Sequence, residues 1–132
     1  MRFRLLILLF VFFSYSCNHH NNYLDEIENT FGVDLSNQVS NEFVDEQWID
    51  FIGDGYRIVI YDITNKSKIN LLTNKMSEYD SAYIEDFFRP SELHSYLSNS
   101  YGYYFGEKQG DDLYYLFYNV KWGKIIYFHS IM

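Results

Sequence analysis

Cysteine and proline are almost absent from this chain. Cys17 is the single cysteine among 132 residues, and Pro90 is the single proline. One cysteine excludes an internal disulfide, and it removes the cysteine pairs on which most structural zinc sites depend. A hydrophobic core must therefore stabilise the fold without covalent or metal cross-links.

Basic residues are also few. Ten Lys and Arg stand against 18 Asp and Glu, which gives a net charge of −8. Nucleic-acid-binding proteins neutralise phosphates with Lys and Arg, so this balance argues against a nucleic-acid partner. It argues equally against contact of the protein surface with anionic lipid. The negative charge favours a basic partner. The plainer explanation of this charge is that it keeps an aromatic-rich chain soluble.

Motifs of catalysis and cofactor binding are missing. The sequence has no G-x-S-x-G elbow, no H-E-x-x-H motif and no phosphate-binding glycine loop. The four histidines lack the spacing of a metal pair: His19, His20, His94 and His129. We therefore expect no enzyme activity and no cofactor.

Asp50 and Asp54 are the weak candidates for a metal site. With Gly55 they match positions 1, 5 and 6 of an EF-hand-type calcium loop. Ile52 and Tyr61 stand at positions 3 and 12, where the loop needs oxygen ligands. A tight turn at residues 53–55, which read Gly-Asp-Gly, explains the glycines without a metal. We therefore predict a turn and no metal.

No apolar run is long enough to span a bilayer. The longest near the N-terminus covers nine residues, 5–13, whereas a spanning helix needs about 20. Arg2 and Arg4 precede this run, and Ser14 and Ser16 follow it. A positive start, an apolar middle and small residues at the exit are typical of a secretory signal peptide.

The N-terminus resembles the bacterial lipoprotein signal over residues 1–17. Cys17 stands where that class carries its acylated cysteine, and Ser16 fits the pattern, while Ser14 and Tyr15 depart from it. The resemblance implies cleavage before Cys17 and anchoring in the bacterial envelope through acyl chains such as palmitate. The outer membrane is favoured because position 18 is not Asp. Free secretion or periplasmic release is the alternative, since Ser14 and Ser16 also suit ordinary signal peptidase.

These segments give the domain organisation. We expect a signal peptide at 1–16, the lipidated Cys17 with a polar tether at 17–22, and a single domain at 23–132. Removal of the signal would take Arg2 and Arg4 and no acid, which changes the net charge from −8 to −10.

Hydrophobic periodicity predicts an α+β domain. It indicates helices at 23–31 and 91–98 and strands at 43–52, 56–63, 101–108, 113–121 and 124–131. Residues 64–76 read as a loop with a possible short strand at 69–72, and residues 79–88 follow a helical face loosely. The expected fold is a small antiparallel sheet, with an N-terminal hairpin plus a C-terminal three-strand meander, and two or three helices packed on one face.

Aromatic residues are abundant, with 14 Tyr, 12 Phe and 2 Trp. Alternation along 113–121 makes both faces of that strand apolar or aromatic. The second face is either covered by the N-terminal helix and loops, which is favoured, or exposed as a Tyr-rich platform for a partner. The candidate partner-binding residues are Tyr114, Tyr115, Tyr118 and Trp122.

The expected function is non-catalytic. We predict a lipid-anchored envelope protein that binds another, basic protein in the manner of an immunity protein or inhibitor. Two alternatives stay open: a carbohydrate or small-ligand module that uses exposed Tyr and Trp, and a structural envelope lipoprotein.

Overall fold

The computed structural model describes residues 23–48, 54–80 and 91–131. The predicted signal peptide, Cys17 with its predicted tether, Asp50 and Pro90 lie outside these residues. The described elements follow in this order: α2 (Tyr23–Phe31), β1 (Val39–Trp48), β2 (Gly55–Ile63), α3 (Ser67–Leu72), η1 (Thr73–Lys75), β3 (Ser77–Asp80), η3 (Ser91–Leu93), α5 (His94–Leu97), β4 (Tyr101–Gln109), β5 (Asp112–Asn119) and β6 (Lys124–Ile131). Among them no helix is long and apolar enough to cross a membrane.

The strands form one antiparallel sheet in the order β1-β2-β6-β5-β4-β3. β2 and β6 lie side by side over eight residue pairs, from Gly55 with Ile131 to Asp62 with Lys124. This pairing joins the N-terminal and C-terminal strands into a single sheet. A hairpin plus a three-strand meander accounts for five strands, whereas the described sheet has six.

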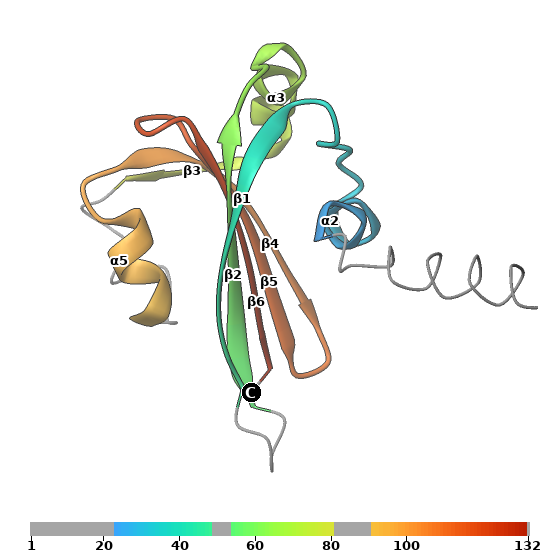
Figure 1. The fold of residues 1–132 in the computed structure, drawn as a ribbon, viewed down its shortest axis with the longest axis vertical. Coiled ribbons are helices and arrows are strands. Elements are labelled where there is room, and N and C mark those ends of the chain that lie inside the picture. Colours follow the sequence, from blue (N-terminus) through green and yellow to red (C-terminus); the bar gives the residue numbers. More distant parts are fainter. Residues whose placement is uncertain (1–22, 49–53, 81–90, 132) are drawn as a thin grey trace, which may run out of the picture.

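Helices cover both faces of the sheet, which corrects the prediction that they pack on one face. Figure 1 shows α2 on one side of the sheet and α5 on the other. Ile27 of α2 and Ile69 of α3 belong to one buried cluster, while Leu93 and Leu97 of η3 and α5 belong to the other. Helices are needed on both faces because the central strands present apolar side chains on each.

Strict alternation in the three central strands builds the two clusters. Val59, Leu116 and Tyr127 point toward α2, and their neighbours Ile58 and Phe117 point toward α5. All five are at most 2% exposed. Alternation of this kind is what a strand buried on both faces requires.

Two segments differ from their predicted structure. Residues 67–72 form α3, where a loop with a possible short strand was expected, and Ile69 anchors that helix in the core. Residues 77–80 form β3, where a loose helical face was expected from Tyr79 onward. Tyr79 is buried against the Phe117 ring, at 5.6 Å between centroids, so tertiary packing decides this segment.

β1 is an edge strand of the sheet. Its regular part begins at Phe43, because the pairing with β2 shifts register between Ser40 and Phe43. Asn41 lies in this irregularity with a φ of 55°, and its Nδ2 donates to Asp62 Oδ2 at 2.9 Å. Bulges of this kind end regular pairing along an edge. Residues 43–48 are therefore the regularly paired segment of this edge strand.

Candidate functional site

The predicted partner-binding residues do not form one surface. Tyr114 and Tyr118 lie on the α2 face of β5, Tyr115 lies on the α5 face, and Trp122 lies in the turn between β5 and β6. Tyr118 is 4% exposed and packs in the core, whereas Trp122 is 41% exposed. Successive residues of a strand face opposite ways, so Tyr114 and Tyr115 cannot serve one platform.

The predicted metal candidates are also separated. Asp54 precedes β2 and is half-buried, while Asp50 lies outside the described residues. Among residues 23–48, 54–80 and 91–131, no three His, Cys, Asp or Glu side chains are placed to hold a metal ion. Cys17, the predicted lipidation site, likewise lies in the part of the chain not described.

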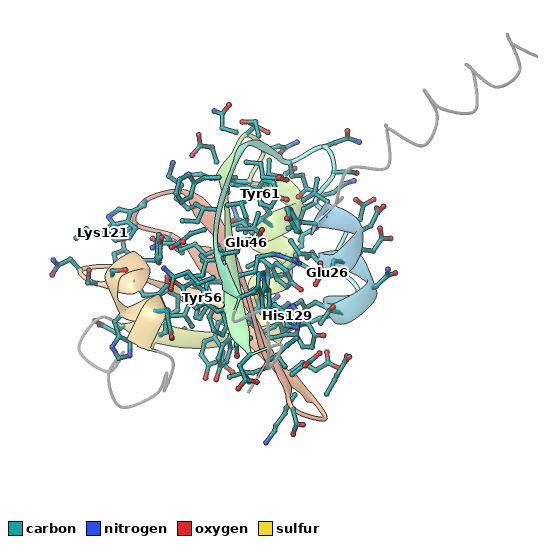
Figure 2. The ribbon with its side chains drawn as sticks, turned by 60° about the horizontal axis from the view of Figure 1, so that its bottom comes forward. Glu26, Glu46, Tyr56, Tyr61, Lys121 and His129 are labelled. Atoms are coloured by element: carbon teal, nitrogen blue, oxygen red, sulfur yellow. The ribbon has the colours of Figure 1, made fainter. Side chains whose placement is uncertain are left out.

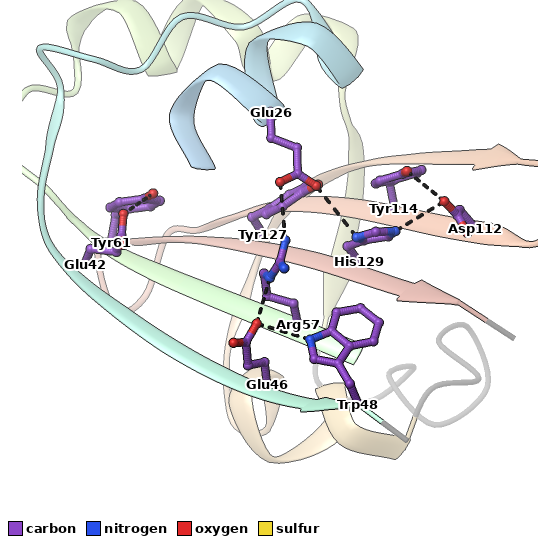
Figure 3. Close-up of polar contacts among 10 residues, drawn as sticks. All are labelled: Glu26, Glu42, Glu46, Trp48, Arg57, Tyr61, Asp112, Tyr114, Tyr127 and His129. Carbon is purple, nitrogen blue, oxygen red and sulfur yellow. Dashed lines mark hydrogen bonds and ion pairs between the residues drawn. The ribbon is translucent and has the colours of Figure 1, made fainter. Parts of the chain in front are cut away.

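A network of polar side chains connects α2 to the sheet, and sequence reasoning missed it. Its centre is Glu26 of α2 (Figure 3). Tyr127 donates its hydroxyl to Glu26 Oε1 at 2.7 Å, and Arg57 donates Nη1 to Oε2 at 3.4 Å. Burial, and then the hydrogen bond to Glu26, raises the pKa of Tyr127 well above that of a free phenol. The carboxylate thus fixes α2 against β2 and β6.

His129 of β6 is enclosed between two carboxylates and two rings. Its Nδ1 lies 3.7 Å from Glu26 Oε1 and its Nε2 lies 3.4 Å from Asp112 Oδ2. The imidazole stacks on Tyr114 at 4.4 Å between ring centroids, and Trp48 meets it edge-on at 6.0 Å. The side chain is only 12% exposed.

Arg57 extends the network to the edge strand. Its guanidinium lies over the rings of Tyr23 and Trp48, at 4.9 and 5.5 Å from their centroids. Its Nε donates to Glu46 Oε2 at 2.9 Å, and Trp48 Nε1 donates to the same oxygen at 3.2 Å. The bonds from Arg57 and then Trp48 lower the pKa of Glu46. The network therefore holds two β1 side chains in fixed positions.

The arrangement holds its side chains in fixed positions. The imidazole lies between two carboxylates, and these are the kinds of group that general acid–base catalysis uses. Tyr114 and Trp48 contact His129, however, and both of its nitrogens already face carboxylates of the protein. Of the charged side chains in the network, Glu46 of β1 is the most exposed, at 42%.

Three carboxylates of β1 are each held by a donor from elsewhere in the fold. Tyr61 donates to Glu42 at 2.7 Å, Arg57 donates to Glu46, and Tyr96 of α5 donates to Asp45. Burial, and then the bond to Asp45, raises the pKa of Tyr96 to about 12.

Two of these acids lie on the α2 face of β1 and Asp45 lies on the other. Figure 2 shows Glu46 in the same region as Tyr61, Glu26 and His129, with Lys121 across the molecule. The acids line the edge strand on both of its faces.

Asn41, Phe43 and Gln47 of β1 are exposed to solvent, whereas Val44 and Trp48 are partly buried. Phe43 is 55% exposed, and no described residue pairs with the outer edge of the strand. Residues 23–48, which include α2 and β1, contain seven Asp and Glu and no Lys or Arg. Acidic side chains, an exposed ring and unpaired backbone thus coincide on one element.

The sequence matches no protein-family model, and comparisons with curated proteins and with solved structures find no match.

Proposed function

We propose that this protein is a lipid-anchored component of the bacterial envelope whose domain binds another, basic protein without catalysis, as an immunity protein or inhibitor does. One observation carries the binding proposal: the edge strand β1 holds three carboxylates in place through donors from β2 and α5. Side chains that are already ordered lose little entropy when a partner binds.

Charge supports a basic partner. The described residues include fifteen Asp and Glu and seven Lys and Arg. α2 adds the exposed Asp25 and Glu28 to the acids of β1, and the contacts of Arg57 with Glu26 and Glu46 place these two elements side by side. An acidic surface of this kind raises the association rate with a basic protein, and the rate falls with ionic strength.

The binding proposal is tested with the full chain as a bacterial host processes it. The envelope is cross-linked at low and at high salt, and proteins joined to the chain are identified and quantified. We expect one basic protein at a stoichiometric amount, lost at high salt. A correctly folded chain that captures no protein under either condition would refute the proposal.

The anchor is tested with Cys17→Ser in the same host. Acyl chains on Cys17 hold a protein in the membrane, and a chain without them is released to the soluble fraction. We expect the variant in the soluble fraction and the original chain in the membrane fraction, with labelled palmitate incorporated only into the latter. A variant that stays in the membrane contradicts the lipoprotein proposal.

A carbohydrate-binding module is the second candidate, favoured by two exposed rings. Tyr101 is 52% exposed and Trp122 is 41% exposed. They lie at one corner of the sheet, where Val120 N donates to Tyr101 O at 3.0 Å. Exposed rings stack on sugars, so Trp122→Ala would abolish glycan binding and leave protein capture unchanged. Screening the full chain against envelope glycans separates the two candidates.

A further inference from the structure

We propose that the outer edge of β1, over residues 43–48, adds a strand from the partner: an extended, Lys- or Arg-bearing segment of a basic protein. This inference rests on the proposed function and specifies its binding mode. The carrying feature is a backbone edge that no described residue pairs with, because half of the amide and carbonyl groups of an edge strand point away from its neighbour.

The length and geometry of β1 favour this edge over the opposite one. β1 spans ten residues, and Phe43–Trp48 pair with β2 in unbroken register. The other edge is β3, which has only four residues. A peptide strand that adds to a sheet gains its affinity from main-chain hydrogen bonds, so it needs a run of regular edge of about this length.

Charge decides which strand β1 accepts. Glu42 and Glu46 lie on one face of β1 and Asp45 lies on the other, so an added strand meets carboxylates on both sides. Two copies of β1 paired with each other would bring like charges together, which is destabilising. An incoming segment with Lys or Arg on both faces instead gains opposite-charge pairs, and one apolar residue of it can cover Phe43.

The three acids of β1 each accept a hydrogen bond from another element, so their charge can be removed while that bond is kept. Glu42→Gln, Asp45→Asn and Glu46→Gln together remove three charges, yet each amide keeps an oxygen that accepts the bond from Tyr61, Tyr96 or Arg57. The matched control is Glu78→Gln, Asp80→Asn and Asp111→Asn, which removes three exposed charges on β3, at the opposite edge of the sheet, and in the turn between β4 and β5. Both variants change the net charge equally.

The probe is a synthetic ten-residue peptide with blocked ends, in which pairs of Lys alternate with a Thr-Val pair, so that Lys lies on both faces of the extended strand. Its affinity for the full chain, solubilised in neutral detergent, is measured at low salt by calorimetry. We expect the β1 variant to bind at least about tenfold more weakly and the control variant to stay within about twofold. Phe43→Ala should weaken binding by about twofold to fivefold, the value of one cross-strand pair.

Hydrogen exchange identifies the binding mode. We expect the peptide to slow amide exchange within residues 43–48 and nowhere else to a similar degree. A peptide N-methylated at every second residue cannot donate along one edge and should not bind. Equal binding of the N-methylated peptide, equal weakening by both charge variants, or no slowing at 43–48 would each overturn strand addition. Protein capture that persists in that case would leave the proposed function intact.

Discussion

Tyr127 is the residue whose hydroxyl joins the core to α2. Its side chain is fully buried, and it donates to Glu26 at 2.7 Å. Tyr127→Phe removes one hydrogen bond to a carboxylate, so we expect the free energy of unfolding to fall by about 1–2 kcal/mol. Urea denaturation measures this change. Tyr101→Phe, at an exposed position, is the control and should stay within about 0.5 kcal/mol. Equal stabilities of the two variants would contradict the assigned role.

Arg57 is the cation that balances Glu26 and Glu46. Arg57→Met keeps much of the side-chain volume and leaves the two carboxylates without their partner, so we expect a loss of about 2–3 kcal/mol at neutral pH. The partly exposed position of Glu46 holds this below the cost of breaking a fully buried pair.

The stability that Arg57 contributes should decrease as the pH falls. The pKa of Glu46 is lowered in the folded protein, so the stability gained from this pair is present above the ordinary pKa of a carboxyl and is lost as the pH falls through the folded value. The difference between Arg57→Met and the original chain should be largest near neutral pH and should shrink below about pH 4. Urea midpoints across that range measure it, and a difference that stays constant would exclude an ionic origin.

At the scale of elements, Gly102 allows β4 to lie close to β5. A Cβ at this position would overlap the Tyr118 carbonyl oxygen and come within 3.1 Å of Val120 N, both of which are backbone atoms. A Cβ at Gly106 would instead meet the Tyr115 ring at 2.9 Å, and a side chain can move. We therefore expect Gly102→Ala to cost about 2–3 kcal/mol and Gly106→Ala clearly less. Urea denaturation of both variants measures the order, and the reverse order would contradict this account.

Elements with strong local patterns were predictable from the sequence. Tyr23–Phe31 forms the predicted helix, which Gly32 follows with a φ of 72°. Leu93 and Leu97 are both buried, as their spacing of four predicts. The residues of α3 and β3 were assigned otherwise because both elements are short and depend on distant contacts. Apolar residues on both faces of 113–121 favoured cover on each face over an exposed platform, although the predicted fold gave helices to one face only.

The polar network was not predictable, because its members are far apart in the chain. Glu26, Arg57 and His129 come from α2, β2 and β6 and meet only when β2 pairs with β6. The one local signal was Arg57, which stands with Asp62 as one of two charged residues in a strand rich in apolar and aromatic residues. The predicted Tyr-rich platform failed to form one surface because strand alternation divides Tyr114 from Tyr115.

At the scale of the whole molecule, charged residues are distributed unevenly. The first described segment, 23–48, carries seven acids and no base, while all seven described Lys and Arg follow it. Arg57 and Lys124 pair with acids of neighbouring elements. The acidic segment therefore contributes most of the net negative charge, and this uneven distribution gives the molecule one side suited to a cationic partner.

Buried and partly buried tyrosines make the whole molecule sensitive to alkali. Burial raises the pKa of both Tyr79 and Tyr96 from 10.0 to about 12, and Asp45 adds to the effect at Tyr96. The folded protein thus binds more protons than the unfolded chain between about pH 10 and pH 12. Stability is fully present below pH 10 and should fall as the pH rises toward 12.

We expect circular dichroism and phenolate absorbance to change together in one cooperative alkaline transition, since these phenols ionise when the core opens. Tyr96→Phe removes one of these groups and should flatten the pH dependence of stability in this range. Tyr101→Phe, an exposed tyrosine, should leave it unchanged. Gradual ionisation of every tyrosine with circular dichroism intact would show that the rings are solvated and that the two faces of the sheet are not covered as described.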